Sequence, residues 1–248
     1  MISLMICSRD PAKFSAVSAM YRAALAGAEW EMIHIPDARS LAEGYNRAIA
    51  RSRGELLIFS HDDIEVLSPD FPGRLARHLS RFDLIGVAGT DLLIHPHWAA
   101  ADSRHCYGQI AYPTADGKFD VNIIGAPDRA VGGIQALDGC FMAARRQVIE
   151  RIAFDAVNFD GFHLYDLDFS FQAYHAGFKL AVVNDINLLH QSGGDYGAEW
   201  ARYAERFAKS WRLPPALTPR EFDCPSITVR SKAEALKVMT PVHWGAEA

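Results

Sequence analysis

The stretch SLAEGYNRAIARSRGELLIFSHDDIEV, residues 40–66, joins a helix, a strand and an acidic cluster in direct succession. Ser40 and Glu43 have the spacing of a capping box, which predicts a helix that begins here and continues to residue 53. The apolar run at 55–60 predicts a buried strand. Because ligands of α/β sheets bind where strands end, this one stretch bears on both the fold and the site.

Strands and helices also alternate on both sides of this stretch. Apolar runs and helical periodicity predict a strand at 2–7, a helix at 12–25, a strand at 31–35, a helix at 70–80 and a strand at 84–89. The alternation predicts an α/β fold with a Rossmann-like, mostly parallel sheet flanked by helices.

The sequence of the second half of the chain predicts a mixed arrangement of strands and helices. Residues 91–135 are expected to be irregular with short strand candidates, and residues 136–145 to form a strand interrupted at Asp138-Gly139. The remaining expected elements are a helix from Arg146, a helix that ends near Ala176, strands at 179–183 and 186–190, and a helix at 197–212. We expect a single domain over residues 1–212 and a C-terminal tail, residues 213–248, that wraps it.

The amino-acid composition limits the classes of protein to which the chain can belong. Half of the 248 residues are hydrophobic and the formal net charge is −5, which suits a packed core and argues against nucleic acid as the main partner. The four cysteines lie far apart without a CxxC pair, which favours free thiols in a reducing compartment. The apolar start is too short for a signal peptide, and no stretch approaches the ~20 apolar residues that span a bilayer, so we expect a soluble, cytoplasmic protein.

The segment His61-Asp62-Asp63 offers hard oxygen ligands and one imidazole. On extended backbone alternate side chains share a face, so His61 and Asp63 would point together and Asp62 elsewhere, towards a ribose or a backbone donor. This set suits Mg²⁺ or Mn²⁺. The alternative is a solvated acidic loop that caps the next helix.

Two later segments add candidate groups. Asp166 and Asp168 lie at the expected start of a helix, where the helix dipole favours carboxylates. They either cap that helix or supply a general base. His190 ends a strand beside Gly193-Gly194, and is either a further metal or phosphate contact or an ordinary histidine at a strand end.

Taken in this order, the segments resemble an inverting family 2 glycosyltransferase of the GT-A fold, in the branch whose metal motif begins with histidine (HDD). The resemblance covers roughly residues 2–195. It rests on the stretch at 40–66, on LIGVAG with the later Trp98, on LDGCFMAARRQVI (137–149), on FDGFHLYDLDFSFQAYHAGFKLAVV (159–183) and on LLHQSGG (188–194).

The resemblance implies a nucleotide-binding half over residues 1–90 and an acceptor half over residues 91–212. It also implies a bound Mn²⁺ or Mg²⁺. His61 stands where the family's first aspartate usually lies, Asp63 occupies the last position of the DxD motif, and His190 matches a C-terminal histidine that contacts the metal or the diphosphate.

The resemblance further implies roles around the two substrates. Asp166 matches the general base, and Tyr165 stands where the family usually has glutamate, which is a departure at the acceptor site. Asp138 resembles a residue between the donor and acceptor sites. Contacts to the donor nucleotide are implied for Ser8, Arg9 and Asp37, beside the ribose or backbone contact expected of Asp62 from its alternation with its neighbours. Asn46 is expected to tie its helix to neighbouring loops.

The implied activity is transfer of a sugar from a nucleotide-diphosphate donor to an acceptor hydroxyl, with inversion in one displacement. The expected partners are a nucleotide sugar and a glycan, lipid-linked or protein acceptor, and the protein is expected to be a monomer or homodimer. The alternative is a non-catalytic sugar-nucleotide or glycan-binding module of the same fold, against which the presence of both Asp63 and Asp166 argues. A nucleotidyltransferase would normally show a glycine-rich basic loop after the first strand, which CSRDPAK (7–13) lacks.

The helix expected at 197–212 carries an aromatic stripe beside a basic one. Trp200, Tyr203, Phe207 and Trp211 lie at helical spacing. Packing of this stripe against the body is the expected arrangement, and a membrane-surface contact or a dimer contact is the alternative.

Overall fold

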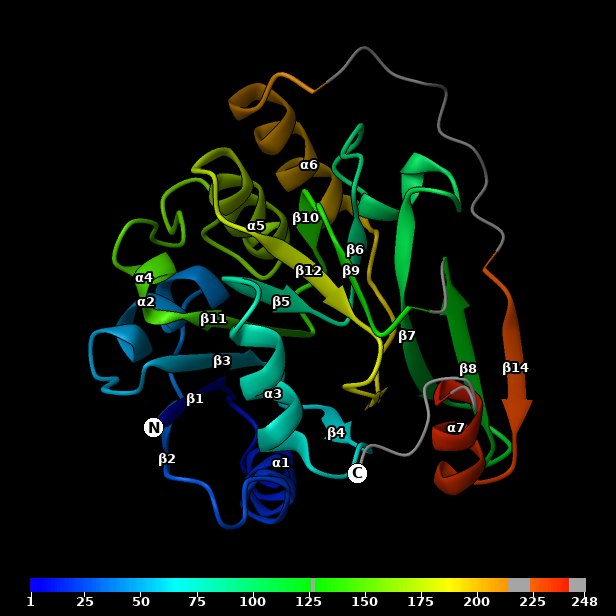
Figure 1. Ribbon diagram of the computed structural model, residues 1–248. Helices are drawn as coiled ribbons and strands as arrows, with labels where there is room; N and C mark the ends of the chain where they lie inside the picture. Colours follow the sequence, from blue (N-terminus) through cyan, green and yellow to red (C-terminus); the bar gives the residue numbers. More distant parts are fainter. Residues whose placement is uncertain (126–127, 214–223, 241–248) are drawn as a thin grey trace.

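The computed structural model describes residues 1–125, 128–213 and 224–240 (Figure 1). In chain order its elements are β1 (Ile2–Cys7), α1 (Pro11–Ala24), β2 (Trp30–Ile35), α2 (Leu41–Ile49), β3 (Leu56–Ser60), β4 (Ile64–Val66), α3 (Phe71–Leu79), β5 (Leu84–Gly86), β6 (Ala88–Thr90), the 3₁₀ helix η1 (Trp98–Ala101), β7 (Cys106–Pro113), β8 (Phe119–Ile124), β9 (Ala130–Gly132), β10 (Ala136–Leu137), β11 (Phe141–Arg145), α4 (Arg146–Ile149), α5 (Tyr165–His175), β12 (Leu180–Val183), β13 (Leu188–His190), α6 (Ala198–Ser210), β14 (Ser226–Val229) and α7 (Lys232–Met239).

The first sheet has the strand order β2-β1-β3-β11-β5-β12-β9. Strands β2, β1, β3, β5 and β12 run in one direction, and β11 and β9 run against them. The chain therefore has the α/β fold with a mostly parallel sheet that its sequence predicts. Two strands of reversed direction come from the second half of the chain, where a mixed arrangement was expected.

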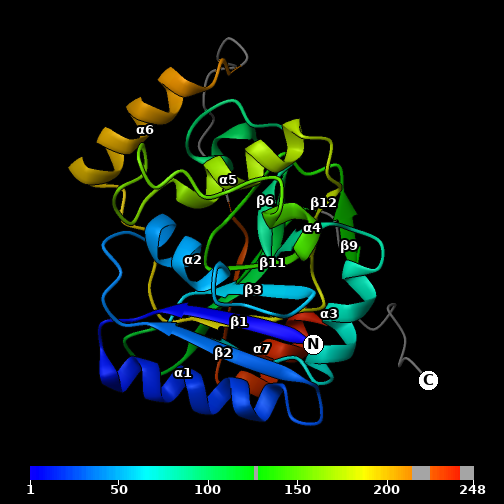
Figure 2. The ribbon, with the colours of Figure 1, turned by 90° about the vertical axis from the view of Figure 1, so that its left-hand side faces the viewer.

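Helices cover both faces of this sheet. Figure 2 shows α1 on one side of β1 and β2 and α2 on the other. The side chains of β1 alternate accordingly, with Leu4 and Ile6 in the core beneath α1 and α3, and Met5 in the core beneath α2 and α5. A strand that is buried on both faces has a continuous apolar sequence, which is the pattern from which this strand was predicted.

A second sheet stands beside the first and has the order β10-β6-β7-β13-β4, with β8 paired to β7 and β14 paired to β8. The described residues 224–240 of the expected tail add strand β14 to this sheet, and helix α7 packs beside β8 and β14. Of the segment expected to wrap the domain, residues 214–223 and 241–248 lie outside the described residues.

Two sequence expectations differ from the structure. The run expected as one strand at 84–89 divides at Val87 into β5 in the first sheet and β6 in the second. This bend leaves no mark in the sequence because the residues on both sides of it are buried and apolar. The region at 91–135, expected to be irregular with short strand candidates, contains two longer strands, the eight-residue β7 and the six-residue β8.

Among the described residues, no helix combines the length and the apolar character needed to cross a bilayer.

Candidate active site

The segment that follows β3 lies where the chain passes from the first sheet to the second. The backbone N–H of His61 donates to the carbonyl of Cys140 at 3.1 Å, which continues the β3–β11 pairing for one residue. Beyond it β4 pairs with β13, with Ile64 opposite His190, and the N–H of Gln191 donates to the carbonyl of Asp63 at 2.9 Å. This pairing brings His190 next to Asp63 although 126 positions separate them in the sequence.

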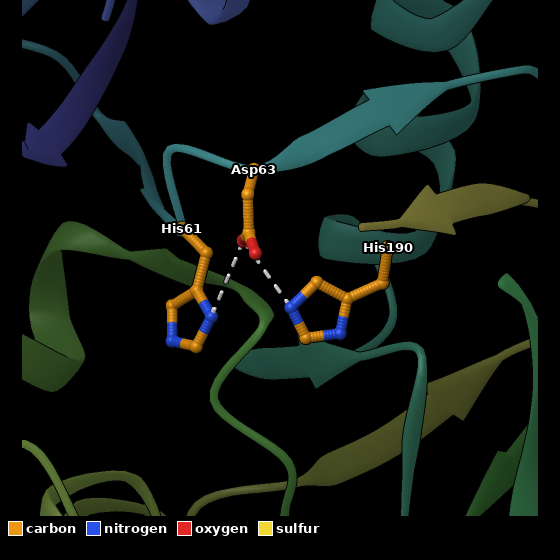
Figure 3. A group of neighbouring side chains, drawn as sticks. All are labelled: His61, Asp63 and His190. Atoms are coloured by element: carbon orange, nitrogen blue, oxygen red, sulfur yellow. Dashed lines mark ion pairs between the residues drawn. The ribbon is translucent and has the colours of Figure 1, made fainter. Parts of the chain in front are cut away.

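His61, Asp63 and His190 converge on one point (Figure 3). Nε2 of His190 lies 3.3 Å from Oδ1 of Asp63, and Nδ1 of His61 lies 4.0 Å from the same oxygen. One nitrogen or oxygen atom from each residue lies within 4.8 Å of the others. Asp62, which shares a turn with Asp63, points elsewhere, and its Oδ2 accepts a hydrogen bond from Ser8 at 2.6 Å.

The pKa shifts of Asp63 and His61 suit a divalent cation. Burial would raise the pKa of Asp63, but hydrogen bonds from His190 and Ser192 and the nearby imidazoles outweigh it and hold that pKa well below its usual range. Burial, together with the neighbouring His190, lowers the pKa of His61 and so favours a neutral ring. A carboxylate and two imidazoles form a donor set that fits Mn²⁺ or Mg²⁺.

A cavity of 390 Å³ opens beside the triad at the carboxyl ends of β1 and β3. Ser8, Arg9 and Asp62 line it together with the basic side chain of Lys13. The Arg9 guanidinium donates to the carbonyl of Ala38 and lies 5.6 Å from the centre of the Phe162 ring. Three of the four residues expected to contact a nucleotide therefore line one cavity.

The fourth, Asp37, is not among the residues that line this cavity. Its carboxylate is exposed and forms an ion pair with Arg47 at 2.8 Å. The same ion pair lowers the pKa of Asp37.

A second cavity of 330 Å³ adjoins the first and contains Asp138 and Asp166 in its wall. His61, Phe162 and Ser192 line both cavities, so the two spaces meet at the triad. Asp138 is held in place from two sides, because the Trp98 indole donates to its Oδ2 at 3.1 Å and the backbone N–H of Cys140 to its Oδ1 at 2.9 Å.

Asp166 and Asp168 have different surroundings. Burial, and then the charge of Asp138, raises the pKa of Asp166 to about 7, although backbone N–H groups partly oppose the shift. Asp168 faces away from this cavity and accepts hydrogen bonds from Trp211 at 2.8 Å and Gln172 at 2.6 Å. Asp166 is therefore the carboxyl group available for proton transfer, whereas Asp168 ties α5 to the end of α6.

The structure also shows contacts that were not expected from the sequence. The Tyr165 hydroxyl lies 2.9 Å from Nε2 of His61, and Ser192 donates to Asp63 at 2.6 Å. Tyr196 and Trp200 line the second cavity with their rings 5.4 Å apart. Of these contacts, only that of Tyr165 had a signal in the sequence, because the family that the sequence resembles usually has glutamate at this position.

The remaining sequence expectations concern packing. Asn46 bonds to both backbone groups of Phe154, at 2.8 and 3.2 Å, and so ties α2 to a neighbouring loop as expected. On α6, Tyr203 and Phe207 are buried against the body, which is the expected packing of the aromatic stripe.

Comparisons with known proteins give one family and one fold. A family model described as "Glycosyltransferase like family" matches residues 3–211. No curated protein matches the chain. The mannosyltransferase PcManGT from Pyrobaculum calidifontis, solved in complex with GDP-Man and Mn²⁺, is 12% identical to this chain with a TM-score of 0.51. The match covers 88% of this chain and 66% of the mannosyltransferase, just under two thirds of its length. HddC from Yersinia pseudotuberculosis is 10% identical over 84% of this chain and 100% of its own, with a TM-score of 0.34.

Proposed function

Because the chain belongs to the glycosyltransferase-like family, whose model matches most of its length, we propose that it transfers a sugar from a nucleotide-diphosphate donor to an acceptor hydroxyl. The transfer is metal-assisted and inverts the anomeric centre, with Asp166 as the general base. The donor occupies the cavity beside Ser8 and Arg9, and the acceptor occupies the cavity beside Asp138.

The observation that carries this proposal is a pair of carboxylates with opposite pKa shifts in two adjoining cavities. The pKa of Asp63 is held low, so this group stays ionised, as a cation ligand must. The pKa of Asp166 is raised to about 7, which suits a group that takes up a proton near neutral pH. Such a separation of pKa values is typical of sites in which two acidic groups have different tasks.

At the donor end, His61, Asp63 and His190 would hold Mn²⁺ or Mg²⁺. When bound, the cation would stabilise the negative charge that grows on the departing nucleotide diphosphate. Arg9 and Lys13 add positive charge along the wall of the same cavity. Ser8 holds Asp62 at 2.6 Å and so fixes a carboxylate at this wall, where it can accept hydrogen bonds from the hydroxyl groups of a ribose.

At the acceptor end, Asp166 accepts the proton of the attacking hydroxyl. Burial, and then the charge of Asp138, raises its proton affinity, and Asp138 is itself held by Trp98 and Cys140. Because Trp98 and the backbone N–H of Cys140 engage Asp138, Asp166 acts as a single base, which suits one in-line displacement that inverts the configuration. The aromatic side chains of Tyr196 and Trp200 would help to exclude water, and hydrolysis of the donor is thereby suppressed.

The proposal extends to the organisation of the chain and its partners. Residues 1–90 form the nucleotide-binding half and residues 91–212 the acceptor half of one domain, with 213–248 as an appended tail. Phe162 and Ser192 nevertheless belong to the wall of the donor cavity, and His61 to that of the acceptor cavity. The partners are a nucleotide sugar and a glycan, lipid-linked or protein acceptor, met in the cytoplasm.

The test is thermal stabilisation by UDP, GDP, TDP and CMP, each with and without Mn²⁺, because a ligand that binds only the folded state raises the melting temperature. GDP with Mn²⁺ is the first combination to try, since the similar mannosyltransferase was solved with GDP-Man and Mn²⁺. We expect one nucleotide to raise the melting temperature in a metal-dependent manner, and Asp63→Ala to abolish the effect. Asp116→Asn, at an exposed turn, is the matched control and should leave it unchanged.

Turnover separates the enzyme from a binding module of the same fold. With the stabilising nucleotide identified, the corresponding nucleotide sugar should be consumed by the wild type and bound but not consumed by Asp166→Asn. If the wild type binds the donor and never consumes it, with or without candidate acceptors, the catalytic proposal fails and a binding module takes its place. If no nucleotide stabilises the protein under any metal condition, both fail.

A further inference from the structure

Tyr165 is a buried residue at the start of α5 that has no part in the proposed transfer. Only 2% of its surface is exposed. Its hydroxyl lies 2.9 Å from Nε2 of His61 and 3.2 Å from the carbonyl oxygen of Gly139. It therefore joins one residue of the metal triad to the segment between β10 and β11.

The hydrogen bonds of this group favour one tautomer of His61. The Gly139 carbonyl can only accept, so the Tyr165 hydroxyl donates to it and uses a lone pair to accept from Nε2–H of His61. This arrangement makes two hydrogen bonds. In the Nδ1–H tautomer the Tyr165 hydroxyl would donate to Nε2 of His61, and the Gly139 carbonyl would lose its hydrogen bond. The Nδ1–H group would then face Oδ1 of Asp63 at 4.0 Å, which is too long for a hydrogen bond.

We propose that Tyr165 is a positioning residue that fixes His61 as the Nε2–H tautomer and thereby presents the lone pair of Nδ1 to the metal. Nδ1 is the nitrogen that faces Asp63 in Figure 3, and Nε2 is turned away from it. A partner that holds the second nitrogen of a ligand histidine orients the ring and strengthens the ligand. This inference depends on the proposed function in one respect only, namely that the triad binds a metal ion.

The surroundings of Tyr165 hold the hydroxyl in place. A Cβ atom at Gly139 would lie 2.4 Å from the hydroxyl oxygen and 2.6 Å from Cβ of Asp166, so only glycine permits this approach. The ring packs against Tyr45, with centroids 5.8 Å apart, and against Phe154, with centroids 6.2 Å apart. Phenylalanine at 165 would keep these ring contacts and remove only the hydroxyl.

The experiment has two readouts that require no turnover. Long-range ¹H–¹⁵N NMR spectra of the metal-free protein report the tautomer of His61, assigned through His61→Ala. Loss of the free-ion EPR signal on titration with Mn²⁺ alone reports metal affinity. The proteins are the wild type, Tyr165→Phe, His61→Ala, the double variant, and Tyr203→Phe as a control whose hydroxyl bonds to Asp160 at 3.0 Å and lies outside the triad.

We expect the Nε2–H tautomer in the wild type and in Tyr203→Phe, and a mixture of tautomers in Tyr165→Phe. Mn²⁺ affinity should fall roughly 10- to 100-fold in Tyr165→Phe, as for other partners of ligand histidines. In the His61→Ala background the Tyr165 substitution should have no further effect, because Tyr165 acts through His61.

A wild-type His61 protonated on Nδ1 would overturn the inference, and this result does not depend on whether any variant folds. Unchanged Mn²⁺ affinity in a folded Tyr165→Phe, or an equal loss in the His61→Ala background, would also overturn it. Failure of the wild type to bind Mn²⁺ would instead remove the metal from the proposed function, while the NMR result would still decide the hydrogen-bond arrangement.

Discussion

Replacement of Asp166 by asparagine should stabilise the fold at alkaline pH and leave it nearly unchanged in acid. Burial and the charge of Asp138 raise the pKa of Asp166 to about 7 in the folded chain, against about 3.9 for an unfolded aspartate. The folded state thus binds this proton more tightly than the unfolded state. Its contribution to the free energy of unfolding is fully present below about pH 4 and is lost as the pH rises to about 7. Asparagine cannot ionise and avoids this loss.

The size of the effect follows from the separation of the two pKa values. Three units at about 1.36 kcal/mol each set an upper limit of about 4 kcal/mol, of which about 3 kcal/mol falls between pH 4.5 and pH 8. Asp166 is partly exposed to the cavity, so water reduces the penalty. We therefore expect the free energy of unfolding of Asp166→Asn, relative to wild type, to increase by roughly 1–3 kcal/mol across this pH range.

Urea unfolding at pH 4.5 and pH 8 measures this difference, and the comparison of variant with wild type cancels the other titrating groups. Asp116→Asn is the matched control. Hydrogen bonds from Lys118 and Thr114 lower the pKa of Asp116 to about 2, so its folded and unfolded values both lie below pH 4.5 and no trend is expected. If Asp166→Asn changes by the same amount as the control, Asp166 is an ordinary carboxylate and the argument for its role as a base loses its physical support.

Three further predictions concern activity and stability. If transfer requires ionised Asp166, its rate should rise with pH up to about 7 and at pH 5 should reach only about 1% of its maximum; a flat profile would exclude this base. Asp185→Ala should destabilise the fold by about 3–5 kcal/mol, because Asp185 is 2% exposed and its Oδ1 lies 2.5 Å from Nε2 of His78. Urea unfolding measures this loss, and a loss below about 1 kcal/mol would contradict the prediction. Asn46→Ala should cost about 1–3 kcal/mol through loss of both bonds to the Phe154 backbone, whereas Asn46→Asp, which keeps one acceptor, should cost less in the same assay.

The sequence predicted those features that depend on local pattern. The apolar runs of β1 and β3 are buried on both faces of a sheet, and their polar ends mark the edge where both cavities lie. The expected grouping of His61 with Asp63, and apart from Asp62, is present, although Asp62 and Asp63 lie in a turn and not on the extended backbone from which it was predicted. The roles of these residues remain predictions.

The features that could not be predicted depend on pairing between distant segments. The neighbours of Asp63 are decided by the register of β4 against β13, and a three-residue strand carries too little pattern to reveal its partner. The division of 84–89 between two sheets is hidden because both sheets bury their residues. The role of Asp37 at the nucleotide remains a prediction; its exposed carboxylate pairs with Arg47, ten residues further on, a contact that the sequence pattern did not reveal.

The first two residues of α5 connect the two ends of the site. Tyr165 bonds to the imidazole of His61 beside the donor cavity, and Asp166 faces the acceptor cavity. Both pack against Gly139, where any larger residue would collide with the tyrosine hydroxyl and with Cβ of the aspartate. A shift of this first turn would therefore displace the proposed base and release the proposed metal ligand together. In the proposed transfer this arrangement would keep the distance between the departing diphosphate and the attacking hydroxyl fixed, as an in-line displacement requires.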